Sequence, residues 1–512
     1  MLQNLILNID AGTIDWSRAQ FALTAIYHWL FVPLTLGLAV IMGIVETIYY
    51  RTKEQFWKDA AIFWQKLFGI NFAMGVATGI ILEFEFGTNW SNYSWFVGDI
   101  FGAPLAVEGI VAFFMESTFV AVMYFGWKKV SPGFHLASTW LTGLGATISA
   151  WWILVANAWM QYPVGCAFNP DTMRNEMVSF AEVALSPFAI SKFCHTVTSA
   201  WIIGAVFCVG VCSWYMLKRR EPRLSIESMK IGAAVGLVAA LLAAATGHKS
   251  AQDVAAVQPM KLAAMEALYD GGNGIGLKVI EGIEVPKALS FMATNDFEGY
   301  VPGINNILNG YTTPDGKVEP SIDEKIERGK QAIAALAAYR RAKHEGAEEV
   351  VINAQLALLN ENMPYFGYGY IRDKEDVVPP IAVNFWAFRV MVGLGGLFIL
   401  FFAVVLAGAY GWPKALWRDR SITSLPKWHY WIAIALIPLG YIASESGWLV
   451  AEFGRQPWTI QDMLPTWAAV SDLQSGSVMI TFFLFLLLFT TMLAVEINIL
   501  LKQIKKGPES YF

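Results

Sequence analysis

Side chains that could bind a metal or carry a proton interrupt several long apolar runs of this sequence. They include His28, Glu83, Glu85, Glu108, Glu116, His195, Arg389, Met391, Glu445 and Glu452. An ionisable group at membrane depth is costly unless it is paired or hydrated, so each is a candidate functional residue. Counted inward along their helices, His28, Glu108, His195 and Met391 lie at a shared depth of roughly 10 to 15 Å. Because histidine and methionine are axial ligands of haem iron, the set indicates a site for several haem irons.

Each of these residues also has a purely structural explanation when taken alone. A single intramembrane histidine can bond a neighbouring helix, and Met391 can simply fill the core. Arg389 can extend to the membrane interface, and Glu108 with Glu116 can form a paired polar seam. The shared depth of the histidines, the thioether and the carboxylates is what favours a metal-binding arrangement.

Three classes of membrane protein use such residues. A proton-coupled transporter explains buried carboxylates, but it usually has repeated halves and interrupted helices, and neither is visible here. A haem-copper oxidase or a bis-histidine cytochrome b needs at least about four to seven intramembrane histidines. This chain has 6 in all, and four of them lie at loops or span edges: His135, His248, His344 and His429. A haem protein that adds Met and Glu ligands is the main interpretation, with the transporter as the alternative.

The elements that must position these residues are membrane-spanning helices. The chain has 512 residues, is 56% hydrophobic and 15% charged, and has a mean hydropathy of +0.46, outside the range of soluble proteins. Runs long enough to cross about 30 Å of hydrocarbon lie near 19–50, 62–86, 100–126, 134–161, 188–217, 228–246, 381–410, 428–453 and 475–502. The sequence predicts an all-α polytopic membrane protein with about nine transmembrane helices.

Lysine and arginine are unevenly divided between the loops. One alternating set of loops is basic and includes Lys128, Lys129, Arg219, Arg220, Lys414, Arg418 and Arg420, whereas the other set is nearly bare. Because basic loops stay in the cytoplasm, we expect a periplasmic amino end and a cytoplasmic carboxyl end. The net charge of -5, with no basic face beyond this signal, excludes a nucleic-acid partner.

A polar stretch separates the sixth run from the seventh, and the alternation of loops places it outside the membrane. Its segment SIDEKIERGKQAIAALAAYRRAKHEGAEEVV has acids early and bases late, which is typical of a helix. We expect transmembrane helices 1–6 over 1–246, an extracytoplasmic loop over 247–380, and helices 7–9 with a cytoplasmic tail over 381–512.

The eighth run ends in the sequence WLVAEFGRQPW. Gly454 followed by Pro457 is an ordinary helix stop. Glu452, however, lies in the last turn, where a carboxylate meets the negative end of the helix dipole at a cost of about 0.3 to 1 kcal/mol. A positive group should therefore lie opposite Glu452.

Several stretches together resemble subunit I of the cytochrome bd quinol oxidases, in the form with a long quinol loop. The resemblance covers nearly the whole chain. It rests on SRAQFALTAIYHWLFVPLTLG, FGINFAMGVATGIILEFEFGTNW, FGAPLAVEGIVAFFMEST, SAWWILVANAWMQYPVG, KFCHTV, VQPMKLAAMEA, AFRVMVG and GWLVAEFGRQPW.

This resemblance implies iron ligands. His195 and Met391 are expected to be the axial pair of a low-spin haem b558. His28 and Glu452 are each expected to bind one of two high-spin haems, b595 and d, in either order, with a haem b as the alternative to d. Ferric haem would supply the positive charge that Glu452 lacks, and Arg455 is placed to pair with a propionate or with Glu452.

The other site residues implied by the resemblance fall into three groups. Catalytic roles are expected for Glu108, Glu116, Trp448 and Arg455, with the two glutamates on the proton route. Roles in binding a haem propionate, or in lying beside a haem, are expected for Arg18, Arg389 and Arg455. Quinol binding is expected at Lys261 and Glu266. On ideal helices, Glu108 and Glu116 lie on faces about 80 degrees apart, and Lys261 and Glu266 about 140 degrees apart.

The implied function is that of a haem subunit of a respiratory terminal oxidase in the bacterial inner membrane. Ubiquinol or menaquinol would be oxidised at the outer face and O2 reduced to water, with electrons passing from the low-spin haem to the high-spin haems. The reaction would be electrogenic without proton pumping. The expected partners are subunit II, a small accessory subunit, quinol, dioxygen and membrane lipid.

Overall fold

A computed structural model of the chain describes residues 10–280, 282–412, 422 and 425–508. Within those ranges, 9 helical segments are long and apolar enough to cross a membrane. They are α2 (Ala11–Thr52), α3 (Gln55–Thr88), the composite helix α5–η1–α6 (Gly98–Phe125), α7 (Pro132–Gln161), α9 (Pro187–Lys218), α10 (Pro222–Val257), α16 (Ile381–Tyr410), α18 (Lys427–Phe453) and α20 (Ser475–Lys506). The predicted all-α membrane fold is confirmed. The basic residues Lys414, Arg418 and Arg420 lie outside the described ranges.

Serine followed by proline starts two of these helices. Ser131 and Ser186 precede the first residues of α7 and α9, and each serine hydroxyl accepts the backbone N–H three residues further on, at 3.3 Å and 3.1 Å. A serine cap satisfies a donor that the helix leaves open, and proline in the first turn loses no hydrogen bond. α7 and α9 therefore begin at fixed residues, which sets the depth of the side chains that they carry.

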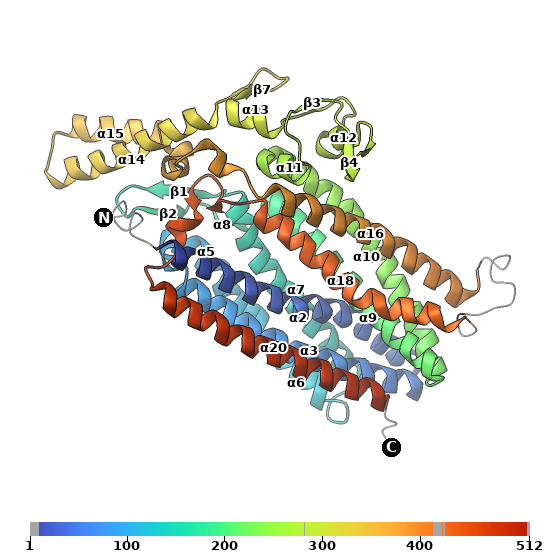
Figure 1. The fold of residues 1–512 in the computed structure, drawn as a ribbon. Helices are drawn as coiled ribbons and strands as arrows, with labels where there is room; N and C mark the ends of the chain where they lie inside the picture. The colour runs from blue at the N-terminus through green and yellow to red at the C-terminus, as the bar shows by residue number, and fades with distance from the viewer. Residues whose placement is uncertain (1–9, 281, 413–421, 423–424, 509–512) are drawn as a thin grey trace.

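α9 lies inside the bundle, where it contacts α2, α7, α10 and α18 (Figure 1). Its Gly204 meets Gly37 of α2 so closely that a Cβ on Gly37 would lie 2.6 Å from the Cα of Gly204. Small residues are what allow two membrane helices to approach to this distance. The glycine pair therefore fixes α2 against α9, and with them the positions of His28 and His195.

The third membrane segment is not a uniform α-helix. Between α5 (Gly98–Val107) and α6 (Phe114–Phe125) it contains a π-helical stretch, η1 (Glu108–Phe113). A π turn holds one residue more than an α turn, so side chains beyond it are rotated by about 100 degrees relative to an uninterrupted α-helix. The stretch begins at Glu108, one of the candidate residues.

The region between α10 and α16 covers one end of the bundle (Figure 1). α10 continues unbroken to Val257, past the apolar run that ends near residue 246, because polar residues such as Gln252 and Asp253 extend the helix beyond that run. The helix predicted in the middle of the region is confirmed as α14, and α15 packs against it. The helices here are α11 (Pro259–Met265), α12 (Ala288–Thr294), α13 (Ile304–Asn309), α14 (Ile322–His344), α15 (Glu349–Asn362), η2 (Met363–Tyr370) and η3 (Lys374–Val377).

Short strands and helices complete the connections. The strands form antiparallel pairs: β1 (Cys166–Asn169) with β2 (Arg174–Met177), β3 (Gly272–Asn273) with β6 (Tyr300–Val301), β4 (Leu277–Ile280) with β5 (Ile283–Val285), β7 (Tyr311–Thr312) with β8 (Val318–Glu319), and β9 (Trp458–Ile460) with β10 (Leu464–Pro465). The short helices are α4 (Ser91–Phe96), α8 (Phe180–Ala184) and α19 (Thr466–Ala469).

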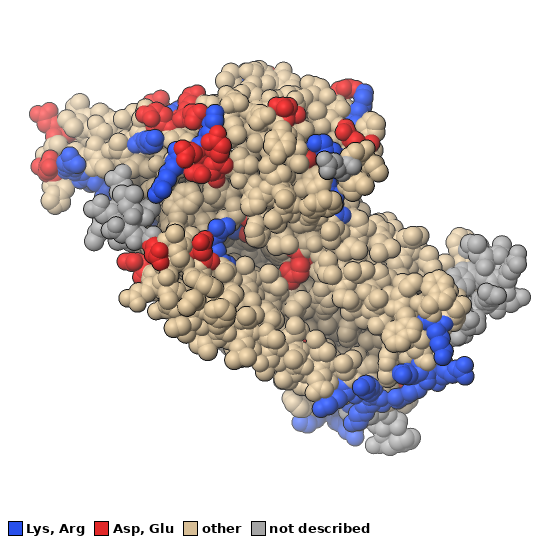
Figure 2. Space-filling model, in the orientation of Figure 1, with Lys and Arg blue, Asp and Glu red and all other residues tan. Residues whose placement is uncertain are grey.

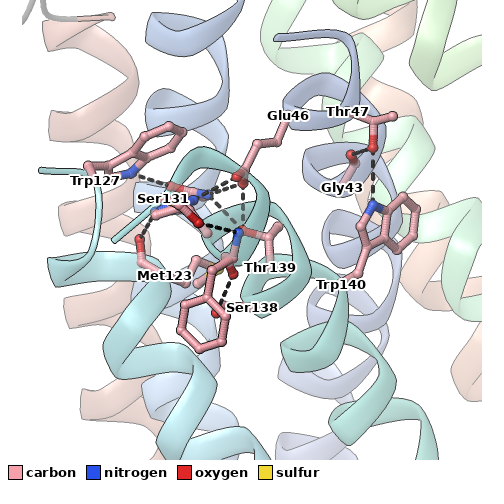
Figure 3. A network of polar contacts seen from close by, with 12 residues as sticks. Gly43, Glu46, Thr47, Met123, Trp127, Ser131, Ser138, Thr139 and Trp140 are labelled. Atoms are coloured by element: carbon pink, nitrogen blue, oxygen red, sulfur yellow. Dashed lines mark hydrogen bonds and ion pairs between the residues drawn. The ribbon is translucent and has the colours of Figure 1, made fainter. Parts of the chain in front are cut away.

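A buried polar network joins α2, α3, α6 and α7 (Figure 3). Glu46 Oε1 lies 2.6 Å from His135 Nδ1, and Glu46 Oε2 accepts hydrogen bonds from Thr139 at 2.5 Å and Gln65 at 2.9 Å. The other ring nitrogen of His135 faces the Met123 carbonyl oxygen at 3.0 Å. Both ring nitrogens of His135 therefore face hydrogen-bond acceptors, which fixes the orientation of the ring. His135 lies in the first turn of α7, at the edge of a span as predicted, and is only 2% exposed.

Replacing His135 with alanine should destabilise the bundle. The change leaves the Glu46 carboxylate buried without its imidazole, and removing one member of a buried pair costs about 3 to 5 kcal/mol. Equilibrium unfolding in mixed micelles measures the loss. His344→Ala, at an exposed position in α14, is the matched control and should change little. A loss below about 1 kcal/mol, the level of an exposed pair, would contradict a stabilising role for the network.

Candidate haem and quinol sites

Four helices form a closed ring within the bundle. α9 contacts α10, α10 contacts α16, α16 contacts α18 and α18 contacts α9, whereas the diagonal pairs make no comparable contact. His195 lies on α9 and Met391 on α16, which are diagonally opposite. Counted from the first residue of each helix, they lie at similar depths of roughly 12 Å and 15 Å. Ligands projecting from facing helices are how bundle cores hold cofactors and metals.

Contacts around His195 leave one ring nitrogen available. Nδ1 lies 3.1 Å from the Ala243 carbonyl oxygen and 3.2 Å from Thr246 Oγ1, both on α10. A partner of this kind on one nitrogen sets the tautomer and orients the other nitrogen for a metal. On the opposite helix, the Met391 sulfur faces α18, where a Cβ on Gly447 would lie 3.1 Å from Sδ. His195 and Met391 are thus both suited to ligation.

Glu452 lies at the end of α18 among several partners. Its Oε1 accepts a hydrogen bond from Asn157 Nδ2 of α7 at 3.0 Å, and its Oε2 accepts one from Arg455. Arg455 is itself fixed by a 3.1 Å bond from Nη1 to the Thr459 carbonyl oxygen. The positive group expected opposite Glu452 is therefore present within the chain.

Basic side chains outnumber carboxylates around Glu452. Lys192 of α9 lies near Glu452, with Nζ 5.6 Å from the Trp448 ring, and both Lys192 and Arg455 act electrostatically on Lys261. Three basic side chains thus share one carboxylate, and an isolated buried charge is costly. An additional anionic group would balance them.

Unpaired donors occur in the same part of the molecule. Among the described residues, Arg455 Nε, Trp90 Nε1 and Tyr93 Oη are buried without a hydrogen-bond partner, and Tyr93 interacts electrostatically with Arg455. Buried donors without acceptors are rare in native proteins and require an explanation. Carboxylates such as haem propionates accept from such donors, so the residues present fit a haem.

His28 lies between α2 and α3. Its Nδ1 is 3.0 Å from Thr78 Oγ1, and a Cβ on Gly79 would lie 3.0 Å from the ring. The neighbouring Trp29 meets Trp448 edge to face, with ring centroids 5.1 Å apart. Nδ1 is therefore held and Nε2 is left for a metal, as at His195.

Arg18, ten residues before His28, also bridges to the end of α18. Its Nη2 donates to Gln456 Oε1 at 3.2 Å. This contact brings the start of α2 to the segment that carries Glu452 and Arg455. The predicted haem-neighbour residues Arg18 and Arg455 therefore lie in one region of the fold.

Glu108 and Glu116 both face α7. Glu108 Oε1 accepts a hydrogen bond from Ser149 Oγ at 2.6 Å, and a Cβ on Gly145 would lie 2.6 Å from Glu116 Cγ. The expectation that the two side chains lie on faces about 80 degrees apart was wrong. The π stretch adds one residue to a turn, so the eight-residue separation corresponds to about seven α-helical positions. At seven positions the two side chains point within about 20 degrees of each other. The two carboxyls are thus aligned along α7.

Lys261 and Glu266 point to different partners, as their spacing predicted. Lys261 Nζ donates to Gln161 at 2.7 Å and to Gln258 at 2.9 Å, on the side of Glu452. Burial, together with the positive charge of Lys192, lowers the pKa of the Lys261 amine well below its usual range. The structure therefore favours a less charged Lys261 than the free side chain.

Glu266 faces α16, where Arg389 Nη2 donates to its Oε2 at 2.7 Å. Arg389 also donates to the carbonyl oxygens of Met265 at 2.5 Å and Lys278 at 2.6 Å. Burial raises the pKa of Glu266 to about 7, although Arg389 opposes the shift. A carboxyl with this pKa can both accept and release a proton near neutral pH.

The chain matches known proteins over nearly its full length. Residues 16–508 match the model of the family described as cytochrome bd terminal oxidase subunit I. This chain belongs to that family. The cytochrome bd-II ubiquinol oxidase subunit 1 of Escherichia coli (strain K12) is 39% identical over 97% of this chain and 97% of its own length. The cytochrome bd ubiquinol oxidase subunit 1 of Bacillus subtilis (strain 168) is 35% identical over 96% and 94%.

A solved structure shares the fold. The bd oxidase of Geobacillus thermodenitrificans matches with a TM-score of 0.76 over 97% of this chain and 99% of that chain, at 22% sequence identity. The resemblance seen in the sequence is therefore confirmed. As a cytochrome bd subunit I, the chain is a multi-pass oxidoreductase subunit of the bacterial inner membrane. Family membership also implies haem cofactors and a second subunit.

Sequence reasoning missed several polar residues of this cytochrome bd subunit. Lys192 lies inside a predicted span, three residues before His195, so the rule that singled out the other intramembrane charges also applies to it. Trp90 and Tyr93 carried no such signal, because aromatic residues are common at membrane interfaces. Their buried, unpaired donors become visible only in the fold.

Proposed function

We propose that this chain binds the haems of a respiratory quinol:O2 oxidoreductase, oxidises quinol and reduces dioxygen to water. The observation that carries the proposal is the placement of His195 and Met391 on opposite helices of the α9–α10–α16–α18 ring. Relatives named as ubiquinol oxidases support quinol as the electron donor.

We propose His195 and Met391 as ligands of haem b558, and His28 and Glu452 as ligands of the two high-spin haems, b595 and d. Bound haem supplies electron transfer and the oxygen-reducing centre. The chain orients the ligands through α10 at His195 and through α3 at His28. The proposed donors for the propionates are Arg455, Lys192, Trp90, Tyr93, Arg18 and Arg389. The buried Nε of Arg389 has no hydrogen-bond partner within the described part of the chain.

We propose a quinol site around α11, within the extracytoplasmic region that ends at residue 380. Lys261 donates a hydrogen bond to a quinol oxygen, and Glu266 accepts a quinol proton. Arg389 holds Glu266 against α16, the helix that carries Met391. Quinol binding is therefore adjacent to the proposed b558 site.

The quinol reaction should depend on pH through Glu266. Only the ionised carboxylate accepts a proton, and its pKa is raised to about 7, so the active fraction grows with pH. We expect kcat/KM for quinol to rise between about pH 6 and about pH 8 in the wild type and to lose this rise in Glu266→Gln. Oxidation of an artificial donor should survive. Glu284→Gln, an exposed glutamate in the same region, is the control, and an unchanged pH profile in Glu266→Gln would remove the proposed base.

Glu116 and Glu108 are the proposed proton route toward the oxygen-reducing site. Glu116→Gln should slow steady-state oxygen reduction strongly, because an amide cannot carry a proton between the carboxyls. The low-spin haem spectrum should stay unchanged, since neither glutamate contacts its proposed ligands. Oxygen uptake and the reduced-minus-oxidised spectrum test both points. Wild-type turnover would leave Glu116 with a structural role only.

The distribution of charge supports the proposed orientation. Figure 2 shows Lys and Arg gathered at the end of the bundle that carries the C-terminus, which is the cytoplasmic end by the positive-inside rule. With Lys261 and Glu266 at the outer face, quinol protons leave outside while protons for water enter from the cytoplasm. The reaction is then electrogenic without a pump. The proposed partners are subunit II and a small accessory subunit.

A reduced-minus-oxidised spectrum of the purified complex tests the proposal directly. We expect low-spin and high-spin haem bands and quinol-dependent oxygen uptake. A complex without haem would overturn the proposal and favour a proton-coupled transporter instead.

A further inference from the structure

The N-terminal half of α2 carries a buried polar face that the proposed function does not use. Thr13, Ser17, Gln20 and Thr24 follow one another at intervals of three or four residues, and none is more than 2% exposed. His28 stands four residues further along. This spacing places all five side chains on one helix face, over about 22 Å of helix.

The neighbouring helices complete this face with polar groups of their own. Thr481 of α20 donates to Gln20 Oε1 at 2.7 Å, and the Thr13 hydroxyl donates to the Leu473 carbonyl oxygen at 2.9 Å. From α3, Glu85 approaches Thr24 and is itself only 2% exposed. Polar groups from α3, from α20 and from the segment before α20 thus line this face of α2, which also carries His28.

Two oxygen atoms compete for the single hydroxyl hydrogen of Thr24. The Thr24 hydroxyl oxygen lies 3.0 Å from the backbone carbonyl oxygen of Gln20 and 2.5 Å from Glu85 Oε1. A hydroxyl has one hydrogen, and a carbonyl oxygen can only accept. If Thr24 donates to Gln20, the short contact needs Glu85 to donate, which requires a protonated carboxyl. A neutral acid is also far cheaper to bury than a carboxylate.

Two atoms along this polar face remain without partners. Ser17 Oγ and Glu85 Oε2 are buried and have no hydrogen-bond partner among the described residues. Buried polar atoms are nearly always satisfied, and water is the usual partner where the surroundings are polar. The hydroxyls and the amide along this face supply the further partners that a chain of water molecules needs.

We propose that Glu85 is a protonated carboxylic acid in a water-filled passage that runs along α2 from Thr13 to His28. The ligand of the passage is water, because its lining offers hydroxyl, amide and carboxyl groups. Under the proposed function, the passage is an outlet for the water made from oxygen. That role rests on the proposed function, whereas the hydration of Glu85 does not.

Infrared spectroscopy of the whole complex in lipid nanodiscs tests the inference. The wild-type spectrum minus that of Glu85→Gln should contain the carbonyl band of a protonated carboxylic acid, because glutamine keeps the shape and removes the acid. In D2O this band should shift as fast as the buffer is mixed, since water reaches the group. Ser17→Leu, which adds an apolar side chain to the polar face of α2, should slow the shift by on the order of ten-fold.

A matched substitution on the other face of α2 provides the control. Ala22 is exposed on the surface of the bundle, so Ala22→Leu should leave the exchange of the Glu85 band unchanged. The inference is overturned by the absence of the band, or by equal exchange rates in Ser17→Leu and Ala22→Leu. Haem spectra of the same samples separate the two proposals: a complex with haem but no band refutes only the passage. A band without haem refutes only the oxidase.

Discussion

Replacing Met391 with leucine should remove the low-spin haem signal and most quinol oxidation. Leucine has nearly the same volume and cannot ligate iron, and such swaps usually cost less than about 1.5 kcal/mol in packing. A thioether opposite a histidine keeps iron six-coordinate and low-spin. We expect the variant to insert, to keep its high-spin haems, and to lose the low-spin bands in the reduced-minus-oxidised spectrum.

Met123→Leu is the control for this substitution. Met123 is fully buried in the core around α6 and lies outside the ring that holds His195, so the same change should leave the spectrum intact. Gly447→Ala adds an independent probe, because its Cβ would lie 3.1 Å from the Met391 sulfur and should displace it. A low-spin spectrum that survives in Met391→Leu would return this residue to core packing.

Replacing Glu452 with glutamine should remove one high-spin haem or its function. The glutamine amide can still accept the hydrogen bond from Asn157, but its NH2 group faces Arg455, which is itself a donor. The substitution also removes the one negative charge that lies among Lys192, Lys261 and Arg455. Losing a group that merely orients a metal ligand costs about 10- to 100-fold in affinity or activity. Oxygen reduction should fall by more than that, and haem content should drop.

Glu496→Gln is the control, since Glu496 is another glutamate of a membrane helix and is buried on α20. It should keep its full haem content and turnover. Glu452 would lose its proposed role as a ligand if Glu452→Gln retained every haem with wild-type spectra.

The sequence predicted the spans and the shared depth of the ligands, because both follow from hydropathy and the rise per residue. It could not show that His195 and Met391 lie on opposite helices of one ring, since that depends on which helices pack together. The pairing of Glu266 with Arg389 joins residues 123 positions apart, and no local pattern reveals such a contact.

Local geometry was predicted less well where the helix is irregular. Ideal α-helical spacing separated Glu108 from Glu116, but the π stretch that begins at Glu108 aligns both along α7. A π turn differs from an α turn by a single residue, and an apolar segment carries no clear sequence pattern that predicts it. The excess of basic groups around Glu452 was likewise hidden, because Lys192, Lys261 and Arg455 come from three different elements.

The unbroken course of α10 decides where loops can be exchanged between relatives. A chimera joined at residue 246 would have its junction inside the helix, between Thr246 and Gly247, which both border the His195 ring. Such a graft would alter the proposed iron site and the proposed quinol site together. A joint placed after Glu266 keeps α10, α11 and both proposed quinol residues in register, so only the remainder of the region between α10 and α16 is replaced. The remainder of that region can then be exchanged without disturbing the proposed iron site at His195.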